Sequence, residues 1–369
     1  TTGTIDLTVS GGTLPYGYTW SNGLTTEDLT NLGVGTYTVT VTDGNGCTAT
    51  LSIAIAEPLA IVLSETHTDV LCNGGTTGTI DLTVSGGTLP YGYTWSNGLT
   101  TEDLTNLGVG TYTVTVTDGN GCTATLSIAI AEPLAIVLSE THTDVLCNGG
   151  TTGTIDLTVS GGILPYGYNW SNGLTTEDLT NLGVGTYTVT VTDGNGCTAT
   201  LSIAIAEPLA IVLSETYTDV LCNGGTTGTI DLTVSGGTLP YGYTWSNGAT
   251  TEDLGGLSVG SYTVTVTDGN GCTATLSIAI AEPLALVLSE THTDVLCNGG
   301  TTGTIDLTVS GGTLPYDYNW SNGLTTEDIN SLSVGSYTVT VTDGNGCTAT
   351  LSIAIAEPLA LVLSETHTD

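Results

Sequence analysis

The stretch NLGVGTYTVTVTDGNGC, residues 31–47, decides the fold that this sequence predicts. In it Tyr37, Val39 and Val41 alternate with threonines, so one face of an extended segment is apolar and the other carries hydroxyl groups. A period of two is typical of a β-strand that buries one face. Residues 43–46 (DGNG) are a tight-turn signal. The stretch therefore predicts a strand that ends in a hairpin turn.

Short segments with the same alternation lie on both sides of this strand, and no helical stripe interrupts them. We expect strands near residues 4–9, 16–20, 51–56 and 59–66, separated by glycine-rich turns. The sequence from Leu32 to Tyr37 also resembles a tyrosine corner, a feature of the penultimate strand in immunoglobulin-like sandwiches. Six or seven short strands in about 75 residues predict a small antiparallel β-sandwich of immunoglobulin-like type.

The whole pattern recurs every 75 residues, which predicts a tandem array. The sequence TTGTIDL opens the copies at Thr1, Thr76, Thr151, Thr226 and Thr301. Pro58 follows the last strand of a copy, so we expect the domain boundaries at this proline and its equivalents. The expected domains are a partial repeat at 1–57 that lacks its first strand, complete sandwiches at 58–132, 133–207, 208–282 and 283–357, and the first strand of a further repeat at 358–369. We expect the chain to be a window of a longer array.

The charge balance excludes several classes of function. The chain of 369 residues carries 36 Asp and Glu but no Lys or Arg, for a formal net charge of −36. Binding to nucleic acid or to an anionic membrane surface needs Lys or Arg, so neither partner is expected. No apolar run is long enough to cross a bilayer, so no membrane insertion is expected in this segment. A hydrophobic content of 39% with only 10% charged residues nevertheless predicts a folded chain.

Three blocks of each repeat resemble a known family. CNGGTTGTIDLTVSGG from Cys72, LPYGYTWSNG from Leu89 and NLGVGTYTVTVTDGNGC from Asn106 closely resemble the SprB repeat, which recurs in surface adhesins of gliding Bacteroidetes. The resemblance covers essentially the whole period, five times. It implies export, through the type IX secretion system, and a role at the cell surface or in a filament. It does not identify a ligand.

The cysteines of such an exported, regularly spaced set are expected to form disulfides rather than a metal or catalytic site. Each period carries one cysteine in DGNGC and one in VLCNGG. Because each unit holds one of each, we expect pairs within repeats, with Cys47 left unpaired by truncation: Cys72–Cys122, Cys147–Cys197, Cys222–Cys272 and Cys297–Cys347. In an immunoglobulin topology, however, the two positions lie at opposite poles of one domain. A bond across a domain boundary, Cys72–Cys197, is therefore an alternative, as are free or interchain thiols.

Calcium is the one cofactor for which the sequence offers weak candidates. Residues 43–46 resemble the start of a calcium loop, but the later ligands are missing, so a hairpin turn is the preferred interpretation. Calcium could otherwise lie between domains, on acidic residues of the linker strand. The candidates are Asp43, Glu57, Glu65 and Asp69, with their equivalents 75, 150, 225 and 300 residues further on. We expect no other cofactor.

No constellation in the sequence indicates catalysis. His67 and its equivalents lie in ETHTD, but Tyr217 replaces this histidine in one copy, so we interpret it as a surface residue. No Gly-x-Ser-x-Gly motif is present. Tyr16, Tyr18 and Trp20 could form a sugar-binding platform, but they share the strand face that a sandwich buries, which favours core packing. We therefore expect no enzyme.

The sequence favours a structural and adhesive function, a non-catalytic extracellular stalk or filament at the cell surface. Its expected partners are further repeats or other copies of the same protein, with surface polysaccharide as a candidate ligand. One alternative is an array of carbohydrate- or calcium-binding modules. Another is a self-assembling fibre subunit, in which residues 359–366 of one copy complete the first repeat of the next by donor-strand complementation.

Overall fold

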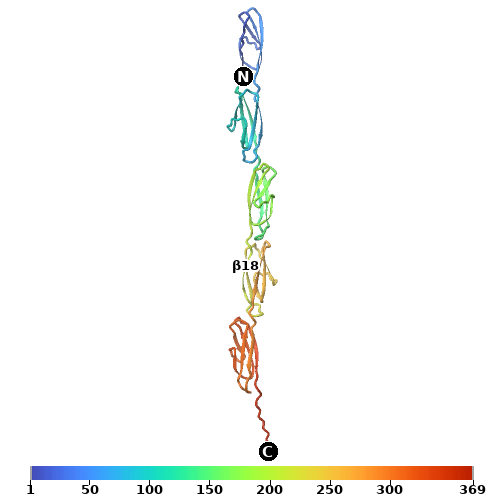
Figure 1. Ribbon diagram of the computed structural model, residues 1–369, viewed down its shortest axis with the longest axis vertical. Helices are drawn as coiled ribbons and strands as arrows, with labels where there is room; N and C mark the ends of the chain where they lie inside the picture. Colours follow the sequence, from blue (N-terminus) through green and yellow to red (C-terminus); the bar gives the residue numbers. More distant parts are fainter. Residues whose placement is uncertain (1, 368–369) are drawn as a thin grey trace. The chain divides into compact units, whose positions relative to one another are not determined.

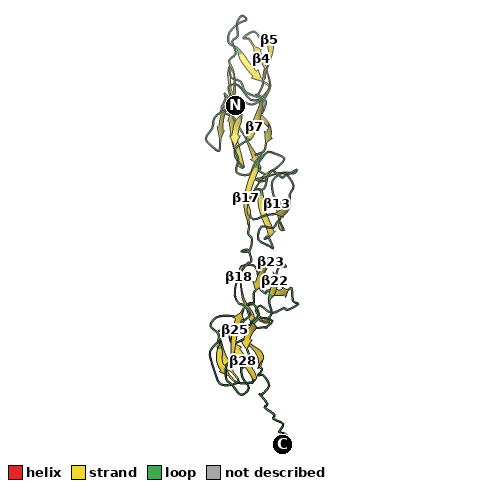
Figure 2. Ribbon diagram, turned by 60° about the horizontal axis from the view of Figure 1, so that its bottom comes forward, coloured by secondary structure: helices red, strands yellow, loops and turns green. Residues whose placement is uncertain are grey.

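The computed structural model describes residues 2–367, and all regular secondary structure in this range is β-strand (Figure 2). The first repeat contains β1 (Gly3–Ile5), β2 (Gly17–Trp20), β3 (Leu29–Leu32), β4 (Gly35–Thr42) and β5 (Thr48–Ile55). The second contains β6 (Val62–Thr68), β7 (Gly78–Ser85), β8 (Gly92–Trp95), β9 (Leu104–Leu107), β10 (Gly110–Thr117) and β11 (Thr123–Ile130). No helix in the described range is long and apolar enough to cross a membrane.

The later repeats reproduce these strands and can be followed by colour in Figure 1. The third contains β12 (Val137–Thr143), β13 (Gly153–Ser160), β14 (Gly167–Trp170), β15 (Leu179–Leu182), β16 (Gly185–Thr192) and β17 (Thr198–Ile205). The fourth contains β18 (Val212–Thr218), β19 (Gly228–Ser235), β20 (Gly242–Trp245), β21 (Leu254–Leu257), β22 (Gly260–Thr267) and β23 (Thr273–Ile280). The fifth contains β24 (Val287–Thr293), β25 (Gly303–Ser310), β26 (Asp317–Trp320), β27 (Ile329–Leu332), β28 (Gly335–Thr342) and β29 (Thr348–Ile355).

The chain forms two compact units, and the division between them passes through the third repeat. Unit one contains residues up to 139 together with 158–175 and 189–201. Unit two contains residues 140–157 and 176–188 and the chain from 202 onward. Unit one thus holds the first and second repeats, and unit two holds the fourth and fifth.

Each complete repeat within a unit is built from two three-stranded antiparallel sheets. In the second repeat the strand orders are β6-β7-β9 and β8-β10-β11. The fourth repeat has β18-β19-β21 and β20-β22-β23, and the fifth has β24-β25-β27 and β26-β28-β29. In order along the chain these six strands correspond to A, B, C, E, F and G of an immunoglobulin sandwich, with A, B and E in one sheet and C, F and G in the other. The predicted fold class is confirmed.

The core of each sandwich is formed by the alternating apolar residues that the sequence singled out. In the second repeat Ile80 and Leu82 of one sheet pack with Trp95 and Val114 of the other, and all four are at most 2% exposed. The Tyr112 hydroxyl donates to the Gly108 carbonyl oxygen at 3.1 Å, which is the expected tyrosine corner. The period-two pattern therefore determines which face of each strand is buried.

The first repeat has a smaller core, because no strand equivalent to β6 covers it. Val41, Ile53 and Ile55 are only partly buried there, whereas their equivalents in the second repeat belong to the buried core. A groove of about 410 Å³ lies open beside them, lined by residues such as Leu7, Val9 and Leu51. At the other end of the described range, residues 356–367 form no strand.

Candidate functional site

The most elaborate polar structure of the molecule joins one repeat to the next, and we call it the junction. It contains the cysteine loop (residues 144–152 and equivalents) and the acidic turn (residues 268–272 and equivalents). The cysteine loop connects the first two strands of a repeat, and the acidic turn connects the last two strands of the following repeat. One complete junction lies within unit one and two lie within unit two.

The acidic turn is built around one carboxylate. Asp268 is only 6% exposed, and its oxygens accept the backbone N–H groups of Thr238, Asn270 and Cys272, each at 2.9 Å. Burial by itself raises the pKa of Asp268, but these hydrogen bonds outweigh it, so the pKa lies below its ordinary value. Asp118, Asp193 and Asp343 have the same environment. The aspartate thus fixes the backbone of the cysteine four residues later.

The cysteine loop is held by carboxylates of its own repeat. Asp144 accepts the N–H of Ala206 at 2.8 Å, and Glu207 accepts the N–H of Gly149 at 2.6 Å. The Asn148 side chain donates to the Pro208 carbonyl oxygen at 3.1 Å. Because these partners lie directly after β17, the loop is fastened to the end of the repeat where the chain leaves it.

The linker that follows is held against the next repeat by a pair of glycines. Gly237 donates its N–H to the carbonyl oxygen of Leu209 at 2.8 Å. Gly236 has a positive φ of 75°, and a Cβ at this position would lie 1.9 Å from the Ala210 carbonyl oxygen. Only glycine fits here, so the linker approaches the turn after β19 directly.

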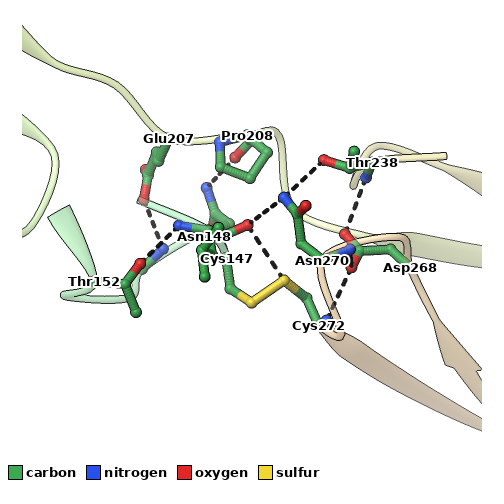
Figure 3. The surroundings of a disulfide bond; sticks show 11 residues. Cys147, Asn148, Thr152, Glu207, Pro208, Thr238, Asp268, Asn270 and Cys272 are labelled. Atoms are coloured by element: carbon green, nitrogen blue, oxygen red, sulfur yellow. Dashed lines mark hydrogen bonds between the residues drawn. A yellow bond between two sulfur atoms is a disulfide. The ribbon is translucent and has the colours of Figure 1, made fainter. Parts of the chain in front are cut away.

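A disulfide joins the two halves of the junction (Figure 3). Cys147 of the cysteine loop is bonded to Cys272 of the acidic turn, with a Cα–Cα distance of 5.6 Å. Beside it the Asn270 side chain donates to the Leu146 carbonyl oxygen at 2.9 Å. Equivalent bonds join Cys72 to Cys197 and Cys222 to Cys347. Asn195 and Asn345 repeat the contact to the preceding cysteine loop.

The pairing expected within repeats is wrong. The structure contains none of the bonds Cys72–Cys122, Cys147–Cys197, Cys222–Cys272 and Cys297–Cys347, and each bond found spans 125 residues in the sequence. The reason is the position of the two loops in one sandwich. In the fourth repeat the acidic turn lies beside the incoming linker (208–211), whereas the cysteine loop lies beside the outgoing Glu282. The alternative across a boundary, Cys72–Cys197, is therefore the pairing observed.

Three cysteines have no disulfide partner among residues 2–367. Cys47, Cys122 and Cys297 are all exposed. In the second repeat, where no cysteine loop faces the acidic turn, the Asn120 side chain bonds to Thr88 of its own repeat at 2.9 Å. The asparagine of DGNGC therefore donates to the cysteine loop of the preceding repeat wherever that loop faces it, as Asn270 does to Leu146.

The structure places the calcium candidates in separate roles as hydrogen-bond acceptors. Asp43 accepts the N–H groups of Thr13 and of Cys47 in its own turn, and Glu65 lies 2.9 Å from His67 Nδ1. Asp69 accepts the N–H of Ala131, and Glu132, the equivalent of Glu57, accepts that of Gly74. The same bonds recur at later equivalents such as Asp343, Glu357 and Asp294. Glu140 and Glu290 also lie 3.0 Å from a histidine Nδ1, but Tyr217 replaces the histidine beside Glu215, and the last candidate, Asp369, lies outside the described residues. Residues 2–367 contain no group of three or more His, Cys, Asp or Glu side chains placed to hold a metal ion.

The aromatic residues do not form an open platform. Trp95 is 2% exposed, and its Nε1–H donates to the Thr101 carbonyl oxygen at 2.8 Å. Tyr93 packs against the core, and burial together with the nearby Glu102 carboxylate raises its pKa. These contacts agree with the predicted core role of this strand.

Sequence reasoning missed Asn148 at the junction, and it considered Glu207 only as an equivalent of the calcium candidate Glu57, not as an acceptor for the cysteine loop. Asn148 and Glu207 lie about 60 residues apart, yet every complete period repeats the combination of CNGG with a later Glu-Pro. That recurrence was the available signal, but spacing alone does not show that the two segments meet.

Comparison with known proteins identifies the repeat. The model of the SprB repeat matches residues 1–25, 64–100, 139–175, 214–250 and 289–325. The chain belongs to the SprB repeat family. No curated protein matches the chain.

Several solved structures of tandem domains are similar, at low identity. The N-terminal eight immunoglobulin domains of Down Syndrome Cell Adhesion Molecule match with 11% identity and a TM-score of 0.30, over 97% of this chain and 70% of that one. The human Desmocollin-1 ectodomain matches with 14% identity and a TM-score of 0.23, over 96% and 94%. The Protocadherin GammaB4 extracellular domain matches with 14% identity and a TM-score of 0.27, over 93% and 78%. At these scores the matches carry no functional argument.

Proposed function

We propose that the chain is a non-catalytic, extracellular stalk segment that carries load between a cell surface and an adhesive region. The observation that carries this proposal is the junction, because the same disulfide and hydrogen bonds recur wherever a cysteine loop faces an acidic turn. Disulfides persist in oxidising compartments, which supports a location outside the cytoplasm. Family membership supports the cell surface and export through type IX secretion, and the boundaries at Pro58 and its equivalents remain our proposal for the domains.

Electron microscopy of the oxidised chain tests this function. Strands of about eight residues rise roughly 3.3 Å per residue, so each repeat with its loops should span roughly 35–40 Å. We expect a thin particle about 180–200 Å long. The variant Cys147→Ser with Cys272→Ser should bend more at one junction. A compact particle, or equal bending with and without that disulfide, would contradict a stalk.

A binding module is the second candidate, and a recurring groove supports it. Grooves of about 420 and 400 Å³ lie beside the Cys147–Cys272 and Cys72–Cys197 disulfides, lined in part by the linker residues 208–211 and 133–136. Titration with calcium and with surface polysaccharide distinguishes the two functions. Saturable binding that scales with the number of junctions would support the module, and its absence would support the stalk.

The alternative of strand exchange between copies concerns the open groove of the first repeat. In the second repeat Ile61 and Leu63 pack at the corresponding position. A synthetic peptide with the sequence of residues 358–366 tests whether this groove accepts a strand. Binding that protects the amides of β1 and the residues after it from exchange would support complementation, and no binding would remove it.

A further inference from the structure

The three disulfides interleave, so two covalent connections cross each complete junction. Each bond spans 125 residues, whereas successive bonds begin 75 residues apart, so neighbouring closed loops overlap. At the junction of Figure 3 the backbone crosses at residues 206–211 and the disulfide crosses beside it. At the preceding and following junctions the same two kinds of connection are present.

The connections form two continuous covalent paths, which we call rails. One rail enters at Cys72, crosses to Cys197, follows β17, the linker and β18 to Cys222, and crosses to Cys347. The other follows β11 and β12 to Cys147, crosses to Cys272, and continues along β23 and β24. Each rail therefore alternates between a disulfide and the last strand of one repeat joined to the first strand of the next.

The length of the first rail, from Cys72 to Cys347, limits how far this part of the chain can be stretched. About 275 residues separate Cys72 from Cys347 along the backbone, but the first rail contains only the stretch from Cys197 to Cys222, about 25 residues. At about 3.5 Å per extended residue this is roughly 90 Å instead of roughly 960 Å. β17 and β18 are already extended strands, so the rail contains little slack.

We propose that the oxidised array from Cys72 to Cys347 is a tether whose length hardly increases when its repeats unfold, and that reduction of the disulfides makes it extensible. Tension passes along the rails, and the four inner strands of the second to fifth repeats lie in closed loops that carry none of it. An array with disulfides inside each repeat would behave differently, because every repeat would still add length on unfolding. This property follows from the covalent topology alone and does not depend on where the protein is located.

Single-molecule stretching of the full chain, held by peptide tags at both ends and with its three unpaired thiols alkylated, tests the proposal. Full reduction should release about 250 further residues between Cys72 and Cys347, or roughly 900 Å. The double variant Cys222→Ser, Cys347→Ser breaks the first rail, and the shortest path then lengthens by about 100 residues, roughly 350 Å. The matched double variant Cys147→Ser, Cys272→Ser removes an equivalent disulfide but leaves the first rail intact, so its maximum extension should equal that of the parent.

The comparison of the two double variants decides the proposal. A larger maximum extension for the Cys222→Ser, Cys347→Ser variant, with no increase for the Cys147→Ser, Cys272→Ser variant, supports the rails. This holds even where both variants lose stability, because the maximum extension measures covalent length and not folding. The proposal would be overturned by equal increases in maximum extension for the two variants, or by an oxidised parent chain that extends as far as the reduced chain.

Discussion

At the scale of single residues, the molecule uses carboxylates without cations. A chain with no Lys or Arg offers Asp and Glu no basic partner except a few histidines, and at the junction backbone N–H groups take that place. Asp268, Asp144 and Glu207 each accept one or more such groups at 2.6–2.9 Å. Hydrogen bonds of this kind favour the ionised carboxylate, so the acidic composition contributes to the junction.

The acidic turns predict a sensitivity to acid. Backbone hydrogen bonds hold the pKa of Asp268 and its equivalents below the unfolded value of about 3.9. The native state therefore binds fewer protons than the unfolded state, and this stability is complete above about pH 5 and is lost as the pH falls through the native pKa. Melting temperatures measured from pH 7 to pH 2.5 should be level down to about pH 5 and then decrease.

Substitution of one acidic turn tests this assignment. Asp268→Asn places an amide N–H₂ group against backbone donors, so the fourth repeat should be less stable at pH 7 and less sensitive to acid than the parent. Asp231→Asn is the matched control, because Asp231 is exposed on β19. A parent-like acid profile for Asp268→Asn would show that the turn is not a source of the pH dependence.

At the scale of elements, alternation predicted the strands and the sandwich, but spacing could not predict the disulfides. Tyr112, Val114 and Val116 alternate in the sequence and lie on the inner face of β10, because the period of a strand is a local property. Which cysteines meet depends on which end of the sandwich each loop occupies. The sequence placed one cysteine of each kind in every complete repeat and suggested a bond within it, whereas in the fourth repeat the turn of Cys272 lies beside the incoming linker and the loop of Cys222 lies beside the outgoing Glu282.

The pairing can be read from a digest with a glutamate-specific protease under non-reducing conditions. The peptide with Cys147 begins after Glu140 and contains Ile163, and the peptide with Cys272 begins after Glu252 and contains Gly255. These differences between copies make the two pairings distinguishable by mass. We expect these two peptides to be joined, and a bond from the Cys147 peptide to the peptide that begins after Glu177 would show pairing within the repeat.

The core of a repeat should account for its own stability. Leu232 of β19 is 2% exposed, so Leu232→Ala should lower the free energy of unfolding of the fourth repeat by about 2–5 kcal/mol. Leu239→Ala removes the same atoms from a side chain that is 74% exposed, and its effect should stay within about 0.5 kcal/mol. Denaturant titration followed by tryptophan fluorescence measures both, and similar values for the two variants would contradict the assigned core.

At the scale of the whole molecule, the interleaved disulfides determine whether a cut in the backbone separates the chain into two pieces. Every peptide bond between Cys72 and Cys347 lies inside at least one closed loop, because each loop begins before the preceding one ends. A single cut in this range leaves its two sides joined through a disulfide. The first repeat lies outside the loops, so the same cut there separates the chain.

An engineered protease site therefore gives a clear prediction. A recognition sequence inserted after Glu177, in the exposed loop before β15, should be cut without releasing a fragment under non-reducing conditions, since both the Cys72–Cys197 and Cys147–Cys272 loops enclose it. The same insertion after Glu27 of the first repeat should release a fragment with or without reductant, because no disulfide encloses it. Electrophoresis with and without dithiothreitol measures both. Disulfides within repeats would also hold together a chain cut after Glu177, so a third insertion, in the linker after Pro208, distinguishes the two topologies. Only a disulfide across the junction, such as Cys147–Cys272, keeps the chain cut at this linker in one piece. Release of a fragment from this variant without reductant would exclude the interleaved disulfides.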